Sequence, residues 1–361
     1  LVQEKAPMGY IDFGGGLAVD YDGSKSDSPG SCNYTIDEYC HDIVELVMQR
    51  LNENNVPHPT IITESGRATV AYYSILLFNV LDVSSFETVS LPKSLPKQYH
   101  EMTANLLDTY AAIDTRRLQE SYNDAVFYLS EVMKMFHSGV ISLREKATAE
   151  GIYWNIIQKV AEIVPTLNRI PPDLEHVGDT LRDVYYCNFS IFQSLPDSWA
   201  IDQLFPVMPI HRLNEKPTRP AIISDITCDS DGKISKFVDY FDYKSALPLH
   251  ELRENEEYIL GVFMVGAYQE TLGDLHNLMG DTNVVSIRIN DDGSYDFTKE
   301  LEGDSVADVL SYVEYDPKRL VNLFRDTAEQ AVKDGKINVR ERRNIMKSFE
   351  DGLRGYTYYE R

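Results

Sequence analysis

The first residues that could do chemistry are three consecutive glycines, Gly14, Gly15 and Gly16. They follow the short apolar run at residues 9–13, which predicts a strand that ends in a backbone without Cβ atoms. Such a turn lets N–H groups come close to the oxygens of a phosphate. A tight turn without any ligand is the alternative, and the glycines taken alone favour it.

Three further segments each place a reactive or charged side chain beside a glycine. Residues 64–67 (ESGR) end a second predicted strand, residues 228–232 (CDSDG) combine a thiol with carboxylates, and residues 266–268 (GAY) bring a phenol beside a glycine. Each has an ordinary explanation when taken alone. Glu64 could be a solvated carboxylate, and Cys228 a buried strand cysteine. Tyr268 is one of 23 tyrosines, most of which are expected to pack.

The composition excludes several classes of protein. The chain of 361 residues has room for about two or three domains, and its hydrophobic fraction of 43% is typical of a globular protein. No apolar run approaches the ~18 residues of a membrane span. A net charge of −23 argues against nucleic acid or an anionic membrane as partner, and it would attract cations weakly, although solubility alone explains it. The four cysteines form no CxxC pair, so a structural zinc site is not expected.

The elements that would position these residues fall into distinct regions. Thr35 and Glu38 have capping-box spacing at the start of a helix over residues 34–51. With strands at 9–13 and 59–64 and a helix then strand over 69–83, the pattern is typical of a parallel barrel. Residues 100–164 contain no proline and show helical periodicity that predicts about three helices.

The second half of the chain begins as strand and ends as helix. Residues 182–300 contain several apolar runs typical of strands, namely 183–190, 221–226, 258–265 and 284–289. A hairpin turn is predicted at 290–294, where the sequence is NDDGS. Helices are predicted over 305–331 and 340–353.

In this order the segments resemble the fold-III family of pyridoxal-phosphate (PLP) decarboxylases. The longer strings at residues 11–21, 225–232 and 266–282 resemble the arginine decarboxylases within it. The resemblance covers essentially the whole chain. It implies an α/β plus β fold in four parts: part of a PLP-binding (β/α)8 barrel at 1–90, a helical-bundle insert at 96–175, an antiparallel β-domain at 176–302, and a C-terminal helical segment at 303–361.

The resemblance also implies roles for individual residues. Glu64 would face the pyridine nitrogen of PLP, Cys228 would return a proton after CO2 leaves, and Asp229 would pair with the cationic end of the substrate. Asp202 is a weaker candidate for that cation. The phosphate would be held by Gly14, Gly15, Gly16, Gly66, Arg67 and Tyr268. The family usually has proline where this chain has Ser65. His276 and Asn277 lie in a string typical of the arginine enzymes, but no physical role follows from the sequence.

The implied function is decarboxylation of L-arginine to agmatine and CO2 in polyamine biosynthesis, that is, of putrescine and spermidine. The implied assembly is a homo-oligomer whose active sites are shared between subunits, in the cytoplasm, with the periplasm left open because no N-terminal signal can be judged. The family's Schiff-base lysine lies early in the barrel, and only Lys5 precedes the three glycines. We therefore expect a C-terminal part of the enzyme that is inactive alone.

Three questions stay open at this point. Magnesium is associated with such enzymes, yet no residue set in the sequence indicates its site. A decarboxylase of another basic amino acid, such as diaminopimelate or ornithine, has the same fold. A non-catalytic or regulatory subunit that lends Cys228 and Asp229 to a partner chain is the alternative from a different class.

Overall fold

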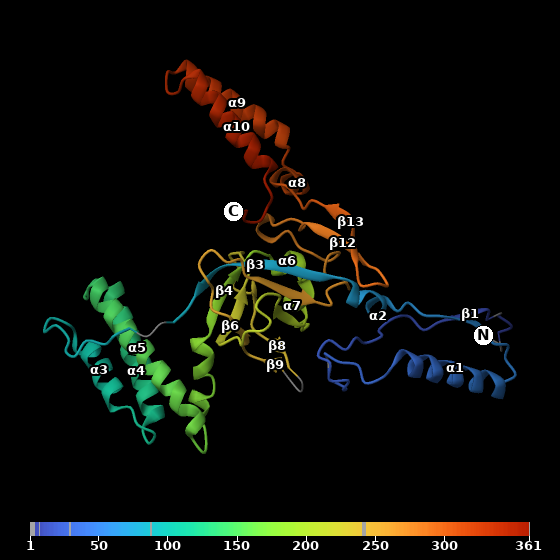
Figure 1. Ribbon diagram of the computed structural model, residues 1–361, viewed down its shortest axis with the longest axis horizontal. Helices are drawn as coiled ribbons and strands as arrows, with labels where there is room; N and C mark the ends of the chain where they lie inside the picture. Colours follow the sequence, from blue (N-terminus) through green and yellow to red (C-terminus); the bar gives the residue numbers. More distant parts are fainter. Residues whose placement is uncertain (1–3, 7, 29, 87–88, 240–242, 361) are drawn as a thin grey trace.

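The computed structural model describes residues 4–6, 8–28, 30–86, 89–239 and 243–360. Its centre is a seven-stranded sheet. An N-terminal β–α–β unit, a helical bundle and a pair of C-terminal helices project from this sheet in different directions (Figure 1). Among the described residues, no helix combines the length and the apolar character that crossing a bilayer requires.

The N-terminal unit is the described part of the expected barrel. Strand β1 (Tyr10–Asp12) pairs in parallel with β2 (Thr60–Ile62), and α1 (Ile36–Glu53) connects them. The predicted capping box is confirmed, because the Glu38 N–H donates to the Thr35 hydroxyl at 3.2 Å and the Thr35 N–H donates to the Glu38 carboxylate at 2.7 Å. No residue of α1 is buried, since a sheet of two short strands covers little of a helix.

Strand β3 (Ile75–Ser84) departs from the expected barrel pattern. The helix then strand predicted over 69–83 is present as α2 (Gly66–Val70), a 3₁₀ turn (Ala71–Tyr73) and β3. However, β3 pairs antiparallel with β4 and β11 of the central sheet. Buried Phe78 and Val80 alternate with exposed or half-buried neighbours, which is typical of antiparallel strands rather than barrel strands. The region expected to be part of the barrel, residues 1–90, thus contributes one strand, β3, to the central sheet.

The central sheet has the strand order β10–β6–β4–β3–β11–β5, with β7 paired to β6. It is mixed rather than purely antiparallel, because β4 and β6 run in parallel. One apolar cluster fills it, in which Phe78 and Phe189 stack with ring centroids 4.2 Å apart. Its further strands are β4 (Asp183–Cys187), β5 (Val207–Pro209), β6 (Arg219–Ser224), β7 (Lys233–Ile234), β10 (Leu247–Leu249) and β11 (Ile259–Phe263). A separate small pair is formed by β8 (Phe237–Val238) and β9 (Tyr243–Lys244).

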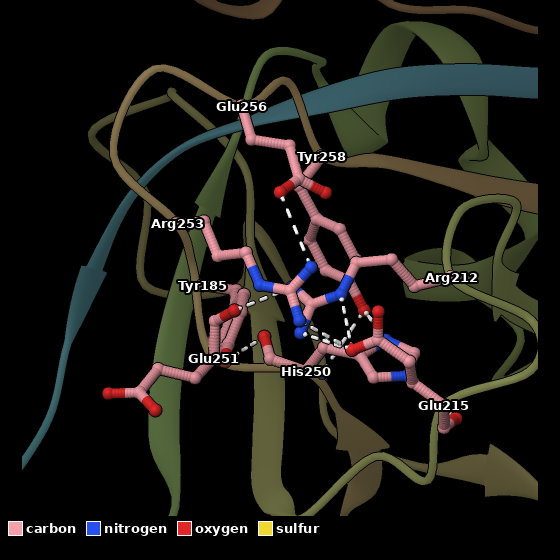
Figure 2. Close-up of polar contacts among 8 residues, drawn as sticks. All are labelled: Tyr185, Arg212, Glu215, His250, Glu251, Arg253, Glu256 and Tyr258. Carbon is pink, nitrogen blue, oxygen red and sulfur yellow. Dashed lines mark hydrogen bonds and ion pairs between the residues drawn. The ribbon is translucent and has the colours of Figure 1, made fainter.

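Buried polar groups fix one edge of this sheet (Figure 2). His250 is enclosed, and its Nδ1 lies 2.8 Å from the Tyr258 hydroxyl while its Nε2 lies 3.0 Å from the Glu215 carbonyl oxygen. The Tyr185 hydroxyl donates to the His250 carbonyl oxygen at 3.0 Å. Outside this group, the guanidinium of Arg253 donates to the Glu215 carboxylate at 2.7 Å. Every hydrogen-bonding atom of the His250 ring is therefore satisfied, which identifies this histidine as a structural residue.

The helical bundle has the three helices that the periodicity predicts: α3 (Glu101–Ala112), α4 (Leu118–His137) and α5 (Leu143–Ile163). Its apolar cluster is separate from that of the sheet. A buried carboxylate joins two of the helices, because Glu145 on α5 accepts hydrogen bonds from the His100 N–H and the Thr103 hydroxyl at the start of α3.

The chain ends in a hairpin and three helices. Strands β12 (Val284–Ile289) and β13 (Tyr295–Leu301) pair with each other alone, and the predicted turn closes with the Asn290 N–H donating to the Ser294 carbonyl oxygen at 2.8 Å. The single helix predicted over 305–331 is two helices, because Asp316 caps a new one that has Pro317 in its first turn. The helices are α8 (Val306–Tyr312), α9 (Pro317–Lys333) and α10 (Val339–Arg354).

Candidate active site

Two glycine turns meet where β1 and β2 end. Gly14 and Gly16 have φ angles of +68° and +86°, in the left-handed region that favours glycine. The Glu64 N–H donates to the Gly14 carbonyl oxygen at 2.9 Å, which couples the two turns. Within the described chain, the N–H groups of Gly15 and Gly16 have no hydrogen-bond partner, so they are free to receive an anion.

A cavity of about 530 Å³ lies against these turns. It brings together six of the residues predicted for a cofactor site, although the first and the last of them, Gly15 and Tyr268, are 253 positions apart in the chain. The predicted residues on its wall are Gly15, Gly16, Glu64, Gly66, Arg67 and Tyr268. The sequence did not indicate the remaining wall residues Leu17, Ala18, Val19, Tyr21, Ser31 and Gln203.

Arg67 is the cation of the cavity, and its position is fixed from three sides. It donates to the Tyr21 hydroxyl at 2.9 Å, lies 3.5 Å from the Asp197 carboxylate, and has its guanidinium carbon 5.0 Å from the centre of the Tyr268 ring. Asp197 is itself held by Gln269, whose amide donates to it at 2.8 Å. Burial opposes the charge of Arg67, but the contacts with Tyr21 and Asp197 outweigh it and raise its pKa.

This support of Arg67 could not be found from residue types alone. The only signal was position, since Tyr21 and Gln269 lie in two of the three strings that carry the resemblance, at residues 11–21 and 266–282. Asp197 lies in none of the three.

Ser65 has a backbone that its usual family counterpart cannot adopt. It precedes α2 with φ 32° and ψ 24°, in the left-handed region. Proline is restricted to φ near −65° by its ring, so the proline that the resemblance leads one to expect here does not fit the turn as this chain forms it. The hydroxyl of Ser65 lies 3.1 Å from that of Thr63.

A close approach of Gly266 places Tyr268 in the cavity wall. The Gly266 N–H donates to the Ala71 carbonyl oxygen at 3.1 Å, and a Cβ at this position would lie 2.0 Å from the carbonyl oxygen of Val70. Only glycine fits this contact. Two residues later, the Tyr268 hydroxyl lies 3.4 Å from the position that a Cβ on Gly66 would occupy. The GAY motif and the ESGR motif therefore pack directly on each other.

Cys228 lies in a second place, on a loop after β6. The buried carboxylate of Asp225 organises this loop by accepting from the Ile191 N–H at 2.9 Å and from both the N–H and the hydroxyl of Thr227. Burial raises the pKa of Asp225, although these hydrogen bonds act in the opposite direction. Gly232 closes the loop, because a Cβ there would lie 2.2 Å from an Asp225 oxygen.

The two residues without an assigned role, His276 and Asn277, lie against this loop. The Asn277 amide donates to the Cys228 sulfur at 3.4 Å, and its oxygen accepts from the Cys228 N–H at 3.3 Å. The His276 Nε2 lies 3.7 Å from the Asp229 carboxylate. Each residue of the Cys-Asp pair thus has a partner in the His-Asn pair.

Neither Cys228 nor Asp229 lines the cavity that holds Glu64 and Arg67. Asp202 does not line it either. This exposed carboxylate makes an ion pair with Lys236 at 3.2 Å, while its neighbour Gln203 contributes to the wall. Within the described chain, Cys228 and Asp229 therefore lie apart from the cavity that gathers the residues predicted for the cofactor.

Three parts of the chain match models of known protein families. Residues 3–71 match the pyridoxal binding domain of pyridoxal-dependent decarboxylases, residues 96–178 match the arginine decarboxylase helical bundle domain, and residues 306–359 match the arginine decarboxylase C-terminal helical extension. The biosynthetic arginine decarboxylase of Thermosynechococcus vestitus is 45% identical over 99% of this chain, and that of Bacteroides thetaiotaomicron is 43% identical over 97%. The chain belongs to the arginine decarboxylase family.

A solved structure of the same family confirms the composite fold. The crystal structure of the biosynthetic arginine decarboxylase from Campylobacter jejuni is 32% identical, with a TM-score of 0.78 over 97% of this chain. The chain spans about half the length of the relatives it matches, since it covers 56% of each of the two curated relatives and 56% of this crystal structure.

The cavity fits the PLP cofactor of the family. Free N–H groups on glycines, a guanidinium and a phenol are donors suited to a phosphate dianion. Glu64 supplies a single carboxylate on the same wall, as the pyridine nitrogen requires. No lysine lines the cavity within the described part of the chain. Among all the residues that the structure describes, no group of three or more His, Cys, Asp or Glu side chains could hold a metal ion.

Proposed function

We propose that this chain acts in the PLP-dependent decarboxylation of L-arginine to agmatine and CO2, in polyamine biosynthesis. The observation that supports it best is the convergence of six predicted residues on one cavity. The relatives named biosynthetic arginine decarboxylase add the substrate to this proposal. Their similarity runs along the whole chain, including the helical bundle, and it favours arginine over diaminopimelate or ornithine as the substrate.

In this proposal the phosphate end of the cavity binds through backbone and side chain together. Gly15 and Gly16 donate their N–H groups, and Arg67 supplies the counter-charge. Because Tyr21 and Asp197 hold Arg67 in place, little entropy is lost when it meets the phosphate. Tyr268, from the GAY motif at residues 266–268, donates its hydroxyl to the phosphate.

PLP supplies an electron sink for the carbon that loses CO2, and Glu64 makes that sink stronger. Its carboxylate accepts a hydrogen bond from the protonated pyridine nitrogen and favours that protonated form. The proposal assigns the Schiff-base lysine to the portion of the relatives that this chain does not span.

Cys228 and Asp229 would serve the active site of a second copy of the chain. Their position outside the cavity supports a homo-oligomer with shared sites. The Cys228 thiol returns a proton to the carbon that lost CO2. Asp229 accepts hydrogen bonds from the substrate guanidinium, which carries a fixed charge and a planar set of donors. We place the enzyme in the cytoplasm.

The test is product analysis of Cys228→Ala in the PLP-loaded holoenzyme that also contains the lysine-bearing portion. The variant should bind PLP normally but misplace the proton. It should release the aldehyde 4-guanidinobutanal in place of part of the agmatine, with the amino nitrogen retained on the cofactor. Clean agmatine at the wild-type rate would remove Cys228 from the reaction.

Two companion measurements separate the alternatives. Glu64→Gln should lower kcat about 30-fold or more with little change in KM, because the ring proton matters mainly after CO2 leaves. Rates on arginine, ornithine, lysine and diaminopimelate then identify the substrate. A holoenzyme that binds PLP yet decarboxylates none of them would favour the non-catalytic subunit.

A further inference from the structure

The turn that carries Asn277 is an unusual piece of backbone. Asn277 and Leu278 both have left-handed φ angles, 57° and 56°, within the short 3₁₀ turn at His276–Leu278. Left-handed φ is unfavourable for leucine and tolerated best by glycine and asparagine. Two such residues in succession indicate that the surrounding contacts hold this turn in one conformation.

The side chain of Asn277 contacts Cys228 at two points. Its amide oxygen accepts from the Cys228 N–H at 3.3 Å, which fixes which end of the amide is oxygen. Its nitrogen is then directed at the sulfur, 3.4 Å away. The distance from Sγ to the amide oxygen is longer, 3.8 Å, so donation to the sulfur is the better of the two contacts.

This arrangement has a consequence for the thiol proton. A sulfur that accepts an N–H on one side has its own S–H directed elsewhere. Cys228 is exposed, so the S–H is left to point away from its own subunit. The neighbouring residue His276 anchors the same turn, because its ring packs on Phe192 with centroids 4.4 Å apart.

We propose that Asn277 is a positioning residue for Cys228. It holds the sulfur in one rotamer and directs the S–H outward, toward the carbon that receives the proton. The inference rests on the proposed function, since it assumes that Cys228 delivers that proton. Nothing in the sequence indicated this contact, because the two residues are 49 positions apart.

The matched variant is Asn277→Asp in the holoenzyme. Aspartate keeps an oxygen acceptor for the Cys228 N–H and tolerates the left-handed backbone, but it replaces the N–H donor beside the sulfur by a second oxygen. Since the thiolate is the nucleophile, alkylation of Cys228 by iodoacetamide should slow about fivefold or more at pH 8. The rate is followed by mass spectrometry of the Cys228 peptide, with exposed Cys40 as the internal reference.

Asn55→Asp is the control substitution. Asn55 is another exposed asparagine with left-handed φ, 52°, and its backbone N–H donates to the Asn52 carbonyl oxygen at 3.2 Å. It should leave the Cys228 rate unchanged. Asn277→Gly, which relieves the backbone strain, is the second variant and serves if Asn277→Asp folds poorly. Asn277→Gly also lacks the N–H donor beside the sulfur, so it should raise the fraction of aldehyde product as Asn277→Asp does.

The product readout completes the test. Asn277→Asp should raise the fraction of 4-guanidinobutanal severalfold. An alkylation rate within twofold of wild type overturns the inference, whatever the products are. Slower alkylation with unchanged products also overturns the positioning role. Cys228→Ala then shows which idea failed, because unchanged products in that variant too would place the failure in the proposed role of Cys228.

Discussion

Replacing Gly266 by alanine tests the packing that places Tyr268 in the cavity wall. The added Cβ would lie 2.0 Å from the Val70 carbonyl oxygen and 2.5 Å from the Tyr73 ring. The first of these atoms belongs to the backbone and cannot rotate away. The turn after β11, which contains Gly266, and the end of α2 must therefore separate by about 1 Å or more before carbon and oxygen reach contact distance.

The cost of this separation has two parts. Forcing an extra methyl group into a packed site costs about 1–3 kcal/mol. Loss of the hydrogen bond from Gly266 to Ala71 costs roughly a further 0.5–1.5 kcal/mol. Together these give about 1.5–4.5 kcal/mol, which corresponds to a rise of roughly 10- to 2,000-fold in the local opening equilibrium.

Hydrogen–deuterium exchange of the β11 peptide measures this opening directly. A chain with several domains does not unfold in one step, so a single melting temperature would not report it. Gly352→Ala is the control, because no atom lies within 4 Å of its Cβ position in α10 and alanine there should stabilise the helix by roughly 0.5–1 kcal/mol. Exchange in β11 that stays within threefold of wild type for Gly266→Ala would refute the packing argument.

Three further predictions follow from single residues. Ser65→Pro should weaken PLP binding at least tenfold, whereas Ser65→Gly should leave it intact, because glycine can adopt φ 32° and proline cannot. Equal affinities of the two variants in a cofactor titration would count against this. His276→Phe keeps the stack on Phe192 but removes the contact of the ring nitrogen with the Asp229 carboxylate at 3.7 Å, so KM for arginine should rise by about fivefold at most without a change in kcat; an effect on kcat alone would contradict the contact. Asp225 has a raised pKa in the folded state, so its contribution to stability is lost as pH rises through that pKa and recovered on acidification. The unfolding free energy of wild type minus that of Asp225→Asn should thus increase as pH falls from 7 toward the ordinary Asp pKa of about 3.9. A difference that stays constant over this range would disprove the raised pKa of Asp225.

Local patterns in the sequence were enough to predict the long helices α1, α3, α4 and α5. The capping box at Thr35 and the three amphipathic helices of the bundle depend on residues within a few positions of each other. The division at Asp316 of the helix predicted over 305–331 was also a local signal, because Pro317 follows this N-cap residue, but the prediction missed it.

Long-range pairing was not predictable in this way. In the central sheet, Ser84 of β3 lies opposite Val184 and Ile75 lies opposite Phe263. These partners are too far apart in the chain for a local sequence pattern to indicate the pairing. The site shows the same limit. The motif glycines, Glu64 and Arg67 were identified, whereas Asp197 and Asn277 act only through partners distant in the chain.

The pairing of Ser84 with Val184 also shows where the helical bundle is inserted in the chain relative to the sheet. Strands β3 and β4 are antiparallel neighbours, so everything from residue 85 to 182 is the connection of one β-hairpin. The entropy of closing a connection grows only with the logarithm of its length, about 0.6 kcal/mol for each doubling. A folded module with its own apolar core could therefore enter an ordinary hairpin turn at little cost to the sheet. By the same reasoning, a short turn joining β3 directly to β4 should leave the sheet folded, which makes the bundle a removable part.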